Sequence, residues 1–209
     1  MINRSAKIGE ATVVVKVDVG LENLADWLLN VLIKMHQSGR VLEDGKSIQL
    51  GWSTLFLRRQ QDGDLIVCEP NFARDPFSEE VPGATCTLKI QASQMEFASR
   101  VKIVPEVTKF QEKIVLEKGC LSVERIYMTR AHPDRDAGDS GWFIGSQKSN
   151  DVILSGNASS EFEAIYAYEL LQLRPELFPA LILPSGFMVM AGSGGIIGVV
   201  NSENEMIAL

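Results

Sequence analysis

Gly138-Asp139-Ser140-Gly141-Trp142 is the stretch that decides how the second half of this chain folds. It closes a polar, charged loop over residues 131–140 and leads into the short apolar run Trp142-Phe143-Ile144. Asp, Ser and Gly favour turns, whereas aromatic and β-branched residues favour strands. The stretch therefore predicts a junction between a loop and a strand. Asp139 and Ser140 either cap the turn or contact a partner, and Trp142 is either a core residue or a partner contact.

Residues 138–141 also match the nucleophile segment of chymotrypsin-like serine proteases. An activated serine needs a histidine base within hydrogen-bond reach and a carboxylate that orients this base. The sequence contains only two histidines: His36 ends a predicted helix, and His132 precedes Ser140 by eight positions in one loop. Neither fits the protease arrangement, so a hydrolase using Ser140 with His132 is only an alternative hypothesis.

The composition is that of an ordinary globular protein, since 45% of the 209 residues are hydrophobic and 22% are charged. The apolar runs are much shorter than a membrane helix requires, and the N-terminus lacks the features of a signal peptide. Cytoplasmic residence is therefore expected. Three widely spaced cysteines, Cys68, Cys86 and Cys120, indicate buried free thiols in strands instead of a disulfide framework or a zinc site.

The net charge of -7 is unevenly distributed. Residues 1–118 carry a net charge of -1, whereas residues 119–209 carry -6. An acidic surface repels phosphate backbones and attracts a basic protein, so nucleic-acid binding is disfavoured and a basic partner is favoured. Charge that serves only solubility is an equally open interpretation.

Hydrophobic periodicity predicts an α+β fold of two small modules, residues 1–118 and 119–209, each a mostly antiparallel sheet with one or two packed helices. In the first module we expect strands over 12–17, 47–59, 65–69 and 84–90, a helix over 21–35, and a helix from Pro105 to Val115. The Asp-Gly pair at 62–63 suits a hairpin turn between the strands over 47–59 and 65–69. In the second we expect strands over 122–129, 142–144 and 186–190, a helix opened by a capping box at Ser160, a turn or short helix at 175–179, and a flexible glycine-rich hairpin or tail over 192–198.

Two further motifs fail on spacing, so no metal or cofactor is predicted. Asp134-x-Asp136-x-Gly138 resembles the start of a calcium loop, but its glycine comes one position early and Gly145 stands where the bidentate glutamate belongs. The glycine-rich run over 192–198 resembles a dinucleotide-binding turn, but only 11 residues follow it.

Several segments of the second module together resemble a known bacterial family, immunity protein family thirty-three. They are Val123 to Arg130, the acidic loop, Asp139-Ser140-Gly141-Trp142-Phe143, a tyrosine-bearing helix, Arg174-Pro175-Glu176, and Leu183-Pro184-Ser185-Gly186-Phe187. The order Asp-Ser-Gly-Trp followed by Leu-Pro-Ser-Gly is the most specific part. The resemblance covers about residues 122–191, and the residues after Trp142 depart from the family pattern.

This resemblance implies a non-catalytic protein that neutralises a cognate toxin by binding it. Binding of this kind needs complementary shape and a few aromatic or charged anchors. The candidate anchors are Arg130, Asp134, Asp136, Asp139 and Trp142. A structural or regulatory domain with a different partner is a third possibility.

Overall fold

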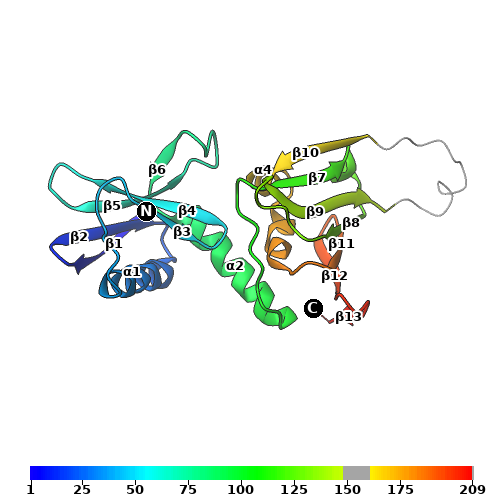
Figure 1. The fold of residues 1–209 in the computed structure, drawn as a ribbon, viewed down its shortest axis with the longest axis horizontal. Helices are drawn as coiled ribbons and strands as arrows, with labels where there is room; N and C mark the ends of the chain where they lie inside the picture. Colours follow the sequence, from blue (N-terminus) through cyan, green and yellow to red (C-terminus); the bar gives the residue numbers. More distant parts are fainter. Residues whose placement is uncertain (148–160, 209) are drawn as a thin grey trace, which may run out of the picture. The chain divides into compact units, whose positions relative to one another are not determined.

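The computed structural model describes residues 1–147 and 161–208, which form two compact units, Met1–Ala92 and Ser93–Leu209 (Figure 1). Each unit is a mixed sheet with helices, so the predicted α+β fold of two modules is confirmed. The sequence predicts a boundary after residue 118, whereas the two units divide after residue 92. Residues 93–118 lie with the second unit because Gln94 donates a hydrogen bond to the Phe178 carbonyl, 3.4 Å away, and the strand at 113–117 belongs to the second sheet.

The N-terminal unit has a sheet in the order β1-β2-β5-β4-β3, with β6 paired to β5. Helix α1 (Glu22–Gln37) packs on β1 and β2 through Ala25, Leu28 and Leu32, which share one face, and this confirms the predicted amphipathic helix. The strands are β1 (Ile2–Ile8), β2 (Ala11–Val17), β3 (Ser47–Leu50), β4 (Ser53–Arg59), β5 (Leu65–Pro70) and β6 (Glu80–Pro82).

Two predictions for this unit were wrong in detail. The single strand expected over 47–59 is a hairpin of β3 and β4 that turns at Gly51-Trp52. The strand expected over 84–90 is the start of helix α2 (Thr85–Val101). The helix forms because the distant Glu69 carboxylate accepts hydrogen bonds from the amides of Cys86 and Thr87, at 3.0 and 2.7 Å, and so caps its first turn. Local sequence does not reveal such a cap.

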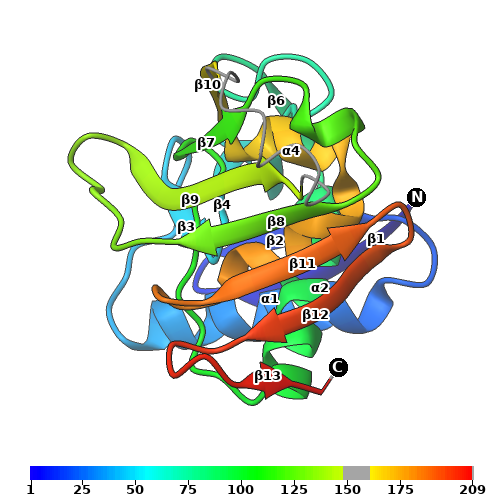
Figure 2. The ribbon, with the colours of Figure 1, turned by 90° about the vertical axis from the view of Figure 1, so that its right-hand side faces the viewer.

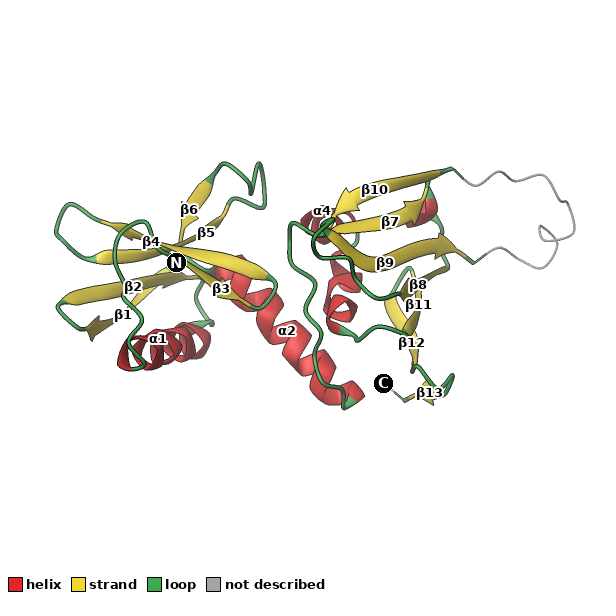
Figure 3. Cartoon of the chain, in the orientation of Figure 1, coloured by secondary structure: helices red, strands yellow, loops and turns green. Residues whose placement is uncertain are grey.

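The C-terminal unit has a seven-stranded sheet in the order β10-β7-β9-β8-β11-β12-β13 (Figure 2). Helix α4 (Ala167–Leu173) and the 3-10 helix η2 (Pro175–Ile182) lie behind this sheet in Figure 2 and bury Leu170, Leu177 and Phe178. The strands are β7 (Lys113–Glu117), β8 (Ile126–Arg130), β9 (Asp139–Ser146), β10 (Phe162–Tyr166), β11 (Met188–Gly192), β12 (Gly195–Val200) and β13 (Met206–Ile207), and a short 3-10 helix, η1, spans Cys120–Ser122 (Figure 3).

One helix predicted for this part of the chain is absent from the described residues, and another begins later than predicted. The segment from Pro105 to Glu112 is not helical and runs into β7, while residues 162–166 form β10 and the helix begins only at Ala167. The strands β7 and β10 pair with each other, from Phe162 opposite Glu117 to Tyr166 opposite Lys113. Ser160, at which we expected the capping box, lies outside the described residues.

The cysteines are free, and Cys68 and Cys120 are buried while Cys86 is partly buried. Only Cys68 lies in a strand; Cys86 is in α2 and Cys120 in η1. Burial raises the pKa of Cys86 to about 12 and that of Cys120 to about 11, so both thiols stay protonated at neutral pH. None of the described helices has the length and apolar character needed to cross a bilayer.

Candidate functional site

The Asp-Ser-Gly-Trp stretch forms the entry of β9, as its composition predicts. The Asp139 carboxylate accepts a hydrogen bond from the Gly141 amide at 2.9 Å. The Ser140 hydroxyl donates to the Lys113 carbonyl on β7 and accepts from the Trp142 amide at 3.2 Å. These bonds fix the turn and join β9 to β7 at the point where both strands begin.

Gly141 allows the end of β8 to approach this turn closely. Its φ of +76° lies in the left-handed region, and a Cβ built on it would stand 2.3 Å from the Ala131 carbonyl oxygen. The Ala131 amide also donates to the Gly141 carbonyl at 2.8 Å. A side chain at this position would therefore separate the backbones of β8 and β9.

Trp142 is buried and lies opposite Arg130 in the β8 and β9 pairing. Its indole nitrogen donates to the Thr108 hydroxyl at 3.1 Å, and the Arg130 guanidinium carbon lies 5.6 Å from the centre of the ring. This distance permits a cation–π interaction in a site without solvent. Trp142 thus contacts both Arg130 and Thr108, which lies in the extended segment before β7.

The buried Arg130 side chain connects three segments that are far apart in the sequence. Its Nη1 donates to the carbonyls of Glu106 and Leu183, and its Nε donates to the Ser140 carbonyl at 3.3 Å. Its Nη2 lies 3.7 Å from the Glu106 carboxylate. Burial lowers the pKa of Arg130, but a guanidinium stays charged at physiological pH.

The Leu-Pro-Ser-Gly segment completes the same cluster. The Ser185 amide donates to the Glu106 carboxylate at 3.0 Å, and the Gly186 amide donates to the Arg130 carbonyl at 2.7 Å. We call this cluster of Glu106, Arg130, Ser140, Trp142 and Leu183 the signature node. The two motifs quoted from the sequence are therefore parts of one structural unit.

The structure corrects part of the predicted contact set. Arg130 and Trp142 lie in the interior, where neither side chain reaches the surface, because both serve the signature node. Asp139 is half-buried, and its carboxylate accepts the hydrogen bond from the Gly141 amide within the turn. Only Asp134 and Asp136 are exposed, on the loop between β8 and β9. Of the five candidate anchors, these two are the ones that a partner can reach.

Ion pairs and a hydrogen bond fix the conformation of this loop. Arg135 donates to the Glu112 carboxylate at 2.8 Å, and its Nη2 lies 3.6 Å from the Glu106 carboxylate. The Asp134 carboxylate accepts from the Ala137 amide at 3.1 Å. Glu106 and Glu112 were not predicted as site residues, because both fall in the segment predicted as a helix. Their partners, Arg130 at the end of β8 and Arg135 in the loop after it, are distant in the sequence and leave no local signal.

Glu106 makes the signature node sensitive to acid. Burial alone would raise the pKa of Glu106, but the hydrogen bond from the Ser185 amide and the charge of Arg130 outweigh it, so this pKa lies below its usual value. The native state then binds fewer protons than the unfolded chain, and the stabilisation is full above the ordinary pKa and lost as pH falls through the lowered one.

We therefore expect the wild type to be more stable than a Glu106→Gln variant at pH 7, and this difference to shrink as pH falls below about 5. Urea unfolding of both proteins between pH 3 and 7 measures it. Parallel stability profiles for the two proteins would contradict the role given to this carboxylate.

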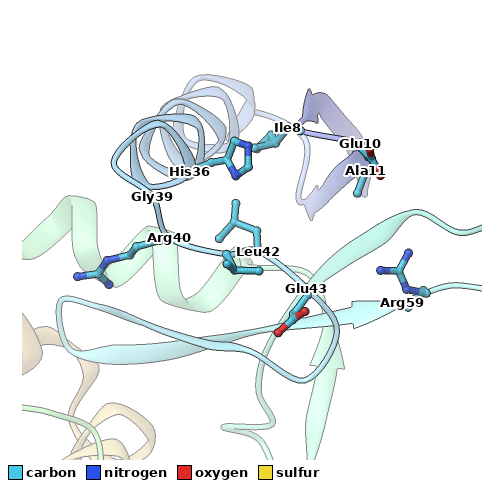
Figure 4. A pocket seen from close by; sticks show the side chains of 11 residues that line it. Ile8, Glu10, Ala11, His36, Gly39, Arg40, Leu42, Glu43 and Arg59 are labelled. Atoms are coloured by element: carbon cyan, nitrogen blue, oxygen red, sulfur yellow. The ribbon is translucent and has the colours of Figure 1, made fainter.

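The N-terminal unit contains a separate cavity of about 320 Å³ beside the end of α1. Figure 4 shows His36 facing it from the helix, with Arg40 and Arg59 at opposite ends. Because these charged groups do not converge, the cavity offers no single anchoring point for a ligand.

The comparisons with known proteins give one match. A family model described as the Imm33-like domain matches residues 93–202, whereas no curated protein and no solved structure matches the chain. The match begins at the first residue of the C-terminal unit and contains the whole signature node. It extends beyond the segments that carry the resemblance in the sequence. The chain therefore belongs to the Imm33-like family through its C-terminal unit.

Proposed function

We propose that this protein is an immunity protein, which neutralises a cognate bacterial toxin by binding it directly and without catalysis. The family supports this function in general. The observation that carries the proposal is the loop between β8 and β9, which exposes Asp134 and Asp136 to solvent. The signature node fixes the ends of the two strands that this loop connects. Neither carboxylate forms an ion pair with any part of the chain that the structure describes.

No arginine of this unit forms an ion pair with Asp134 or Asp136 in the described part of the chain. Arg130 is buried in the signature node, Arg135 is paired with Glu112, and Arg174 donates to Glu176 and to two backbone carbonyls. The loop therefore projects uncompensated negative charge, which speeds the encounter with a positively charged partner and selects against an acidic one. This favours a toxin domain with a basic surface.

The serine-hydrolase alternative has no support at Ser140. This side chain is fully buried, and its hydroxyl donates its hydrogen to the Lys113 carbonyl instead of to a base. His132 lies in the same loop but is exposed. An activated nucleophile needs the opposite arrangement, with an accessible oxygen and a histidine that accepts its proton.

Charge reversal of the loop tests the proposed function. Against the toxin domain encoded beside this gene, the double variant Asp134→Lys/Asp136→Lys is expected to bind at least about tenfold more weakly, mainly through slower association. The matched control is Glu10→Lys/Asp62→Lys, which makes the same change in net charge at two exposed acids of the N-terminal unit. Surface plasmon resonance at two salt concentrations measures both.

The wild type must also form the complex and restore growth of cells that express the toxin. If it does neither, the immunity function is wrong. If the control variant loses as much affinity as the loop variant, net charge and not the loop determines binding.

A further inference from the structure

One face of the C-terminal sheet is largely apolar, and no helix or strand among the described residues of this unit covers it. It is the face opposite α4 and η2, which is turned toward the viewer in Figure 2, and we call it the outer face. Because side chains alternate along a strand, every second residue of the neighbouring strands points outward. The apolar outer-face residues are Val115, Tyr127, Phe143, Phe162, Ala164, Tyr166, Met188, Met190, Val200 and Met206.

The strand register makes this set contiguous. Val115 lies beside Ala164 on one side and Phe143 on the other, and Tyr127 lies beside Met190. The ring centres of Tyr127 and Phe143 are 6.0 Å apart, and those of Phe143 and Phe162 are 5.9 Å apart. A row of aromatic side chains thus spans the four neighbouring strands from β8 to β10, and Met190 on β11 lies beside Tyr127 at one end of this row.

Two outward-facing glycines flatten the outer face. A Cβ on Gly145 would lie 2.6 Å from the ring of Tyr127, so this ring lies across the glycine. A Cβ on Gly198 would lie 3.1 Å from the Met190 methyl carbon and 3.2 Å from the Met206 sulfur. Side chains that lie flat over glycine produce a smooth apolar surface, and methionine adapts well to a partner at such surfaces.

Several members of the outer face remain accessible. Phe162 is 59% exposed, Met206 62% and Val115 37%. Single exposed apolar residues are normal on a soluble protein, whereas a contiguous apolar patch rimmed by polar groups marks an interaction surface.

Charge at the edge of the outer face indicates the kind of partner. The loop with Asp134 and Asp136 leaves the end of β8, and the turn with Glu203 leaves the end of β12, which is the same end of the sheet. These three acids are exposed, and none of them forms an ion pair within the described part of the chain. The face itself carries one charge of each sign, Glu117 beside Phe162 and Lys113 beside Tyr166, and Lys113 lies over the Tyr166 ring. An apolar centre with an acidic edge complements a partner with an apolar centre and basic residues around it.

We propose that the outer face is the toxin-binding surface, with Tyr127, Phe143 and Phe162 at its centre and the acidic loop at its edge. This inference rests on the proposed immunity function and names the surface that performs it. Aromatic residues at the centre of an interface supply most of the binding energy, while charges at the edge speed association.

The test removes apolar surface without changing charge. In the full chain, the triple variant Val115→Ser/Phe162→Ser/Met206→Ser is expected to bind the toxin domain encoded beside the gene at least about 30-fold more weakly. The matched control, Met95→Ser/Val104→Ser/Leu173→Ser, replaces three exposed apolar residues of the same unit that lie outside the outer face. Its dissociation constant is expected to stay within about threefold of the wild-type value. Isothermal titration calorimetry measures binding, and Phe162→Ser alone provides a milder variant if the triple variant unfolds.

The outcomes separate this inference from the proposed function. If the wild type binds and the outer-face variants bind equally well, the surface is wrong and the immunity function stands. If the wild type does not bind, the immunity function itself is wrong. A wild-type dimer that the triple variant converts to a monomer, with no change in toxin affinity, would assign the outer face to a second copy of this chain and overturn the inference.

Discussion

A variant in which methionine replaces Arg130 is expected to lose about 3–5 kcal/mol of unfolding free energy. Methionine fills much of the same volume but donates no hydrogen bonds. The carbonyls of Ser140, Glu106 and Leu183 would then remain buried without their donor. Each orphaned buried acceptor costs about 1–3 kcal/mol, and the loss of the contact with Trp142 adds to this. Chemical denaturation at pH 7 measures the difference.

Two further variants make this prediction specific. Arg125→Met removes an exposed arginine one residue before the same strand and is expected to change stability by less than about 0.5 kcal/mol. Arg130→Lys retains the charge but is expected to recover only part of the loss, because an ammonium lacks the planar fork that reaches separate carbonyls. If the unfolding free energy of the methionine variant were within about 1 kcal/mol of the wild-type value, the stabilising role given to Arg130 would be wrong.

The elements that sequence predicted well are those determined by their own residues. Helix α1 follows from one apolar stripe, and the hairpin between β4 and β5 follows from the Asp-Gly turn at residues 62–63. The hairpin of β11 and β12 likewise follows from its glycines. In each case the local pattern and the tertiary contacts favour the same structure.

The wrong predictions share a different cause. Pro105 is a good first residue for a helix, yet the segment stays extended because Arg130 binds the Glu106 carbonyl and the Glu106 amide donates to the Ile182 carbonyl. Likewise, residues 84–90 alternate like a strand, but the Glu69 carboxylate caps them as a helix. Partners distant in the sequence determine both outcomes, and periodicity within one segment does not contain them.

The candidate site shows the same limit. The Asp-Ser-Gly-Trp motif is conspicuous in the sequence, and the structure uses it for internal hydrogen bonds. The aromatic residues of the outer face are separated by up to 39 positions, from Tyr127 to Tyr166, and only the strand register brings them together. Sequence reasoning therefore identified the family marker but not the surface proposed to bind.

Alanine at Gly141 is expected to destabilise the protein by at least about 3 kcal/mol, well above the cost of a left-handed alanine alone, which is about 1–2 kcal/mol. The excess arises because the new methyl group would meet backbone: the Ala131 oxygen at 2.3 Å, the Ala131 carbonyl carbon at 3.0 Å and the His132 carbonyl carbon at 3.2 Å. Relieving this overlap means moving the end of β8, which carries Arg130 and the acidic loop.

The other Gly-Trp pair in the chain provides the matched control. Gly51 has a φ of +54° and precedes the buried Trp52, but a Cβ there would meet the Gln91 side chain, with the nearest atom at 1.7 Å. That amide oxygen has no hydrogen-bond partner in the described structure, so the side chain can rotate away at little cost. Gly51→Ala should therefore cost only the left-handed penalty of about 1–2 kcal/mol. Equal losses in thermal or urea unfolding of the two variants would show that backbone conformation alone explains Gly141. A larger loss at Gly141, accompanied by weaker toxin binding only for that variant, would show that this glycine sets the position of the loop that carries Asp134 and Asp136.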